Sequence, residues 1–186
     1  LAPVFTDKAH DVDLSFFEVK ADSAAIPSLD KQMIFDDSKA VLTRVMPVKK
    51  YMHLAMVNLS DNGVVSLQGT GKCKKVAFAQ EITDTVASHR TGLFAARLPM
   101  TVRYNTPENF DVSLYMANCA TAIVLDTLGS GLRKAKVCAA GFATSFDVCD
   151  SLYRFGRSPI VKMDQLPARE GQKMGFASVN FPSRDT

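Results

Sequence analysis

The chain has 186 residues, of which 47% are hydrophobic and 22% are charged, and this composition is typical of one globular domain. Its net charge of +3, from 22 basic and 19 acidic residues, argues against a surface built throughout to bind nucleic acid or a membrane. No uncharged run, such as residues 137–146, reaches the roughly 20 residues of a membrane-spanning helix.

We expect residues 1–13 to form an extended N-terminal segment and residues 14–186 to form a single β-sandwich domain. The first residue is Leu1, which fits trimming or proteolysis. The charges within residues 1–20 argue against a signal peptide.

The first half of the chain contains several candidate strands. Strands are predicted at residues 14–20, 51–59, 64–67 and 75–80. Asn62-Gly63 stands between the second and third of these, and this pair predicts a tight hairpin because both residues tolerate positive φ. Residues 28–45 have the spacing of an amphipathic helix, although two short strands broken at Asp36-Asp37 fit as well. A second short helix is predicted at residues 84–89.

The clearest period-two pattern lies at residues 94–104, where apolar side chains alternate with polar ones. Pro99 lacks an amide donor, so this strand should lie at a sheet edge or carry a bulge. The turn at residues 105–109 should lead into an antiparallel partner at residues 110–119.

The last third is predicted to contain strands at residues 133–140 and 174–181, with a long ordered loop at residues 151–166. Residues 117–128 suggest a helix that ends at Gly129-Ser130-Gly131, although Ile123-Val124-Leu125 favours a strand. Many short strands joined by turns predict a mainly β fold: an antiparallel β-sandwich or jelly-roll-like barrel with a few short helices in the connections.

No motif predicts a catalytic site, a metal site or a cofactor. The four cysteines include no CxxC pair and the three histidines are far apart, so zinc spacing is absent. Gly69-Thr70-Gly71-Lys72 lacks the first glycine and the final hydroxyl of a phosphate-binding loop and is interpreted as a turn between strands. The low cysteine density suggests reduced thiols and an intracellular protein, or one carried in a virion.

Three basic clusters are candidate sites for a nucleic acid such as RNA, or for another polyanion. Their members are Lys49 and Lys50; Lys72, Lys74 and Lys75; and Arg133, Lys134 and Lys136. Together with the fold, they suggest a non-enzymatic structural protein that self-associates into a homo-oligomer. By architecture alone this resembles the coat, matrix or movement proteins of viruses.

Two alternatives remain open. Cys73 stands among lysines that stabilise a thiolate, and with His53 or His89 it could serve a cysteine-dependent enzyme. A ligand-binding barrel would instead place apolar side chains around a cavity: Phe94, Met100, Phe110 and Met116.

Overall fold

The computed structural model describes residues 11–21, 23–31, 41–60, 62–126, 131–157, 159–167 and 173–184. These residues form β-sheets whose strand pairs are antiparallel with one exception, which confirms the predicted β-sandwich class, and their one helical turn is a 3-10 helix, η1. The elements in chain order are β1 (Val12–Glu18), β2 (Ser23–Lys31), β3 (Lys50–Val57), β4 (Val65–Gln68), η1 (Cys73–Lys75), β5 (Ala77–Gln80), β6 (Thr85–Val86), β7 (Phe94–Thr101), β8 (Tyr115–Met116), β9 (Cys119–Asp126), β10 (Cys138–Ala139), β11 (Ser145–Asp147), β12 (Leu152–Arg154), β13 (Ile160–Lys162), β14 (Asp164–Gln165) and β15 (Lys173–Asn180).

The first sheet has the order β2-β1-β3-β7-β8, with antiparallel neighbours throughout, and β3 lies at its centre. Side chains along β3 point alternately to the two faces of the sheet. Tyr51, Ala55 and Val57 join the cluster on one face, while Leu54 and Met56 join the cluster on the other. All five are at most 2% exposed, so β3 is buried on both faces.

The second sheet, β12-β11-β5-β4, packs against the Leu54 face and completes the sandwich. Phe146 of β11 contacts two rings of this layer, with ring centroids 6.4 Å from Phe78 of β5 and 4.8 Å from Tyr153 of β12. The opposite face of the first sheet is covered by connections that contribute Met46, Val102 and Leu114.

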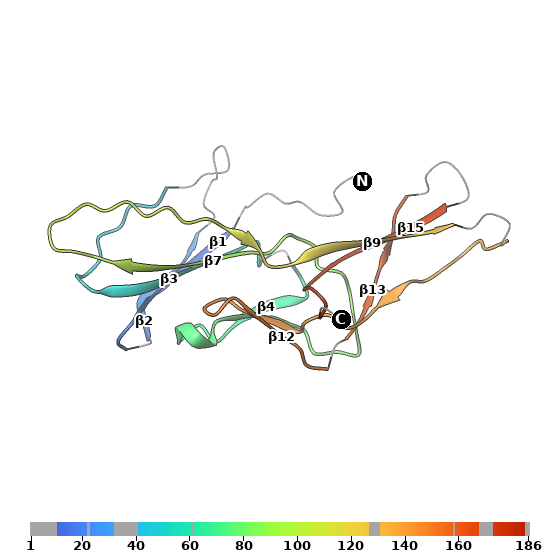
Figure 1. Ribbon diagram of the computed structural model, residues 1–186, viewed down its shortest axis with the longest axis horizontal. Helices are drawn as coiled ribbons and strands as arrows, with labels where there is room; N and C mark the ends of the chain where they lie inside the picture. Colours follow the sequence, from blue (N-terminus) through green and yellow to red (C-terminus); the bar gives the residue numbers. More distant parts are fainter. Residues whose placement is uncertain are drawn as a thin grey trace.

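Two smaller sheets form the other half of the elongated molecule, to the right in Figure 1. The third sheet has the order β14-β15-β9, and the fourth has the order β10-β13-β6 with one parallel pair, β13 with β6. β9 and β15 pair in register from Cys119↔Asn180 to Asp126↔Lys173.

The predicted Asn62-Gly63 hairpin is wrong. A turn is present, with Gly63 at φ +82°, but β3 pairs with β1 and β7 while β4 pairs with β5. The turn therefore carries the chain from one layer of the sandwich to the other. Asn62 is fully buried, and its side-chain amide donates to Thr91 O at 3.4 Å, a tertiary contact that a local turn signal does not reveal.

The predicted helices are wrong wherever they fall on described residues. Residues 84–89 contain β6, residues 117–128 contain β9, and residues 28–31 end β2; the rest of that first helix up to residue 40 lies outside the described residues. The strand alternative at Ile123-Val124-Leu125 is correct. A short helix is stable only when one of its faces packs against the rest of the protein. Residues 119–126 form a strand instead, because β15 provides main-chain hydrogen bonds along the full length of β9 on one side.

The prediction for Pro99 is confirmed. β8 pairs only with Phe94 and Ala95, and no other described strand pairs with the rest of β7 on that side, so Pro99 lies at a sheet edge among the described strands. The expected five-residue turn is wrong, because β7 ends at Thr101 and β8 begins at Tyr115. The expected loop at residues 151–166 contains β12, β13 and β14, and the strand expected at 133–140 is reduced to β10.

Candidate functional site

The strand β9 forms an open edge of the third sheet, called the β9 edge below. Its eight residues pair with β15 on one side and with no described strand on the other. From Cys119 to Leu125 it contains neither a charge nor a proline, and Asp126 is its only acid. Such an edge presents unpaired N–H and C=O groups that can pair with an added strand.

Both faces of β9 are incompletely covered. Val124 is 65% exposed, and Ala120 and Ala122 are exposed on the same face. Ile123 and Leu125 on the opposite face are partly covered. The β9 edge therefore offers apolar side chains beside free backbone groups, the combination that extended peptides use when they extend a sheet.

Buried polar groups fix the start of β9. Asn118 Oδ1 accepts from Leu93 N at 2.9 Å, and Asn118 Nδ2 donates to Thr91 O at 2.9 Å. The same amide group lies 3.1 Å from His89 Nδ1. These contacts join the start of β9 to residues 89–93, the segment that leads from β6 to β7.

His89 belongs to this junction. It is 2% exposed and its ring meets that of Phe181 edge-on, with centroids 5.0 Å apart. Burial lowers the pKa of His89 to about 4, so the ring is neutral near pH 7. The Nδ1 atom of a neutral ring can accept a hydrogen bond from Asn118 Nδ2, whereas an imidazolium has no acceptor.

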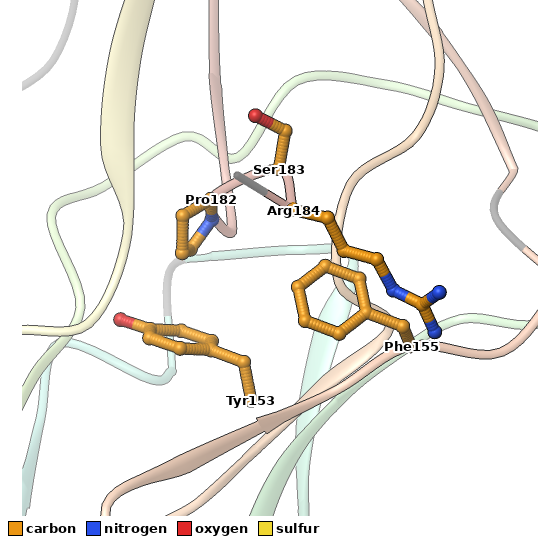
Figure 2. A pocket seen from close by; sticks show the side chains of 5 residues that line it. All are labelled: Tyr153, Phe155, Pro182, Ser183 and Arg184. Carbon is orange, nitrogen blue, oxygen red and sulfur yellow. The ribbon is translucent and has the colours of Figure 1, made fainter. Parts of the chain in front are cut away.

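A second feature is an open hollow of about 430 Å³, lined by Tyr153, Phe155, Pro182, Ser183 and Arg184. Figure 2 shows the Arg184 side chain beside the Phe155 ring, and the guanidinium carbon lies 4.9 Å from the ring centroid. Tyr153 is held by donation from its hydroxyl to Ala117 O at 2.9 Å, and burial raises its pKa. The hollow combines aromatic faces with one cation.

The basic clusters lie on different parts of the molecule. Lys49 and Lys50 are exposed at the start of β3, and the Lys49 ammonium contacts the Glu18 carboxylate at 2.7 Å, which raises the pKa of Lys49. Lys72, Lys74 and Lys75 are exposed around η1, below the first sheet in Figure 1.

Arg133, Lys134 and Lys136 are exposed on the segment that leads into β10, toward the other end of the molecule in Figure 1. The three clusters are therefore not one continuous surface. Their role as anion-binding residues stays a prediction.

Cys73 does not meet either histidine that could activate it. Its sulfur lies 2.6 Å from that of Cys149. His53 Nδ1 contacts Ser15 O at 3.1 Å and its ring stacks on Phe16, while His89 contacts Asn118. The pairs proposed for a cysteine-dependent enzyme are not assembled.

The four side chains expected around a barrel cavity do not surround one. Phe94 and Met100 pack against the cluster that contains Tyr51, Ala55 and Val57, on the face of the first sheet opposite the second sheet. Phe110 and Met116 are 37% and 41% exposed. The described strands form open sheets instead of a closed barrel. The ligand-binding barrel is therefore wrong.

Within the described ranges, no group of three or more histidine, cysteine or acidic side chains is placed to hold a metal ion. Those same ranges contain no helix with the length and apolarity needed to cross a membrane.

Sequence comparison finds no matching family model and no matching curated protein. Several solved structures share the fold. A candidate adhesin from Bacteroides ovatus matches with a TM-score of 0.70 at 15% identity, over 100% of this chain and 64% of that one. A fimbrial anchor protein from Porphyromonas gingivalis matches with a TM-score of 0.68 at 11% identity, over 98% and 68% of the two chains.

A candidate polysaccharide-binding protein from Bacteroides thetaiotaomicron matches with a TM-score of 0.66 at 8% identity, over 95% of this chain and 65% of that one. This chain thus spans about two thirds of the length of these structures. At such low identity the likeness shows a shared fold.

These neighbours overturn the interpretation of the chain as a self-assembling, RNA-binding viral capsid, matrix or movement protein, because they are bacterial adhesin, polysaccharide-binding and fimbrial proteins. The error has a physical source. Short amphipathic strands with irregular connections are a property of β-sandwiches in general and carry no information about the partner.

Proposed function

We propose that this protein is an attachment or assembly module that binds an extended segment of another protein along the β9 edge. The observation that carries the proposal is an eight-residue edge strand whose only charge is terminal and whose Val124 is 65% exposed. Neighbours described as an adhesin and a fimbrial anchor support a role in attachment.

An added strand would gain main-chain hydrogen bonds from the free side of β9, and these bonds are independent of the partner's sequence. Selectivity would come from alternate side chains, one set lying beside Ala122 and Val124 and the other beside Ile123 and Leu125. The buried contacts of Asn118 hold the start of β9 in place before binding, which reduces the entropy lost on association.

Site-specific photo-crosslinking tests the proposal in the cells that make the protein. A photoreactive residue is placed at Ala122 on the β9 edge, or at Ile82, which is 95% exposed in the connection after β5 and serves as the control. We expect a protein adduct from position 122 and none from position 82. Mass spectrometry of the adduct distinguishes a different protein from a second copy of this chain.

The substitution Val124→Lys adds specificity to this test. A lysine at the edge disfavours strand addition through its charge, so the adduct formed at position 122 should be lost. Equal adducts from positions 82 and 122, or an adduct that Val124→Lys leaves unchanged, would contradict the proposal.

A second candidate function is polysaccharide binding at the hollow. Its support is the pairing of two aromatic rings, Tyr153 and Phe155, with the Arg184 cation, since apolar faces with few polar groups are typical of small-molecule sites. One structural neighbour is described as a candidate polysaccharide-binding protein.

Electrophoresis through gels that contain neutral or acidic polysaccharides tests this candidate. Phe155→Ala and Arg184→Ala should abolish any retardation of the wild-type protein. Arg157→Ala is the matched control, because Arg157 is an exposed arginine that pairs with Asp84 and does not line the hollow. Retardation that persists in both hollow variants would exclude the hollow.

A further inference from the structure

Two cysteines that are 76 residues apart in the sequence meet in the core of the sandwich. The sulfur atoms of Cys73 and Cys149 are 2.6 Å apart, although the structure holds both residues as thiols. This separation is well inside the roughly 3.5–4.0 Å at which non-bonded carbon atoms pack. It exceeds the disulfide bond length of about 2.0 Å by little more than half an ångström.

The backbone on both sides of the pair is held by the second sheet. Cys73 begins η1, just before β5, and Cys149 follows β11, which pairs with β5 through Asp147↔Ala77. Val76 lies between Cys73 and β5, and Val148 lies between β11 and Cys149. Val148 N donates to Val76 O at 2.9 Å, which extends the strand pairing toward the two cysteines. The two sulfurs are therefore brought together by regular sheet pairing.

A further contact fixes Cys149 from the first sheet. Arg97 of β7 donates to the Cys149 carbonyl at 2.5 Å. Cys73 and Cys149 are 4% and 7% exposed and belong to the same core cluster. With the backbone anchored at both sites, a bond between the sulfurs requires only a small side-chain movement.

We propose that Cys73 and Cys149 form a structural disulfide that ties the β4–β5 connection to the β11–β12 turn. The oxidant is a disulfide, either of low molecular weight or in a thiol–disulfide oxidoreductase. One protein thiolate attacks it, forming a mixed disulfide and releasing one thiolate. The second protein thiolate then attacks the mixed disulfide at the protein sulfur. The protein loses two hydrogen atoms and two thiols of the reduced oxidant are released.

The burial of both sulfurs sets the order of events. A dissolved oxidant reaches these side chains before the second sheet closes over them, so the bond forms during folding. Once formed, it closes a long loop and stabilises the fold mainly by restricting the unfolded chain. This inference does not depend on the proposed binding function.

Refolding in a buffer of oxidised and reduced glutathione tests the proposal. The refolded protein is unfolded in urea without reductant and treated with an alkylating reagent. We expect two of the four cysteines to resist alkylation, and proteolysis to release one peptide pair joined through Cys73 and Cys149. The thermal midpoint should fall by about 10 °C when reductant is added.

Paired variants provide the control. Cys119→Ser/Cys138→Ser removes two exposed cysteines and should keep the reductant-sensitive shift, whereas Cys73→Ser/Cys149→Ser should lose it. If the latter variant does not fold, the alkylation count and the joined peptide in the wild type still decide. Four alkylated cysteines after refolding, or a bridge that uses Cys119 or Cys138, would overturn the proposal.

Discussion

The strands β3 and β9 have the same length and similar apolar content but opposite environments. Each has eight residues, reading Lys-Tyr-Met-His-Leu-Ala-Met-Val in β3 and Cys-Ala-Thr-Ala-Ile-Val-Leu-Asp in β9. β3 has a strand on each side and a layer on each face, whereas β9 is open on one side and exposed on one face. Burial is thus decided by position in the sheet order and not by strand composition. An apolar edge that the fold leaves open is a candidate site for a partner.

Truncating one side chain in each strand should give the largest contrast in stability. Leu54→Ala in β3 removes a fully buried side chain and should lower the free energy of unfolding by about 2–5 kcal/mol. Val124→Ala in β9 should change it by less than about 0.5 kcal/mol, because Val124 is mostly exposed. Urea unfolding followed by circular dichroism measures both, and similar losses in the two variants would refute the contrast.

The junction between the two regions should respond to acid. The folded-state pKa of His89 is about 4, below its ordinary value of 6.5, so between these values the unfolded chain binds a proton that the folded chain does not. The contribution of His89 to stability is complete above pH 6.5 and is lost as the pH falls toward 4, by about 3 kcal/mol.

A variant without the titrating ring isolates this effect. His89→Gln should show a shallower loss of stability between pH 6.5 and 4 in urea titrations. The remaining slope includes His53, whose pKa burial also lowers. If the wild type and His89→Gln have parallel pH profiles, His89 is not the source of the acid sensitivity.

Period-two alternation predicted the sandwich strands, because it follows directly from a sheet with two different environments. Pro99 likewise marked a sheet edge correctly: it lies opposite Met52 of β3 on one side, and without an N–H donor it cannot complete hydrogen bonding to a second strand on the other side. Asn62-Gly63 predicted a turn but gave no indication of how the flanking strands pair, because β3 pairs with β1 and β7 while β4 pairs with β5.

The candidate sites were less accessible to sequence reasoning. The β9 edge was obscured because residues 117–128 fit a helix about as well as a strand, and its exposure depends on which strands pair far along the chain. The contact between Cys73 and Cys149 follows from the pairing of β5 with β11. The expectation of reduced thiols was based on the number of cysteines and the absence of a CxxC pair. Neither feature shows which distant cysteines the pairing of β5 with β11 brings together.

The smallest expected change in stability provides the most direct test of the β9 edge. Val124→Lys should leave the free energy of unfolding within about 0.5 kcal/mol, because the exposed lysine keeps its hydration. It should still reduce the yield of the photo-crosslinked adduct at position 122, since a charge on a flat edge opposes the addition of a strand. Ile82→Lys adds the same charge at another exposed apolar position, so it controls for the general effect of net charge on solubility. A reduction in adduct yield that is specific to Val124→Lys identifies the β9 edge as the binding surface, whereas equal reductions in both variants would assign the loss to net charge alone.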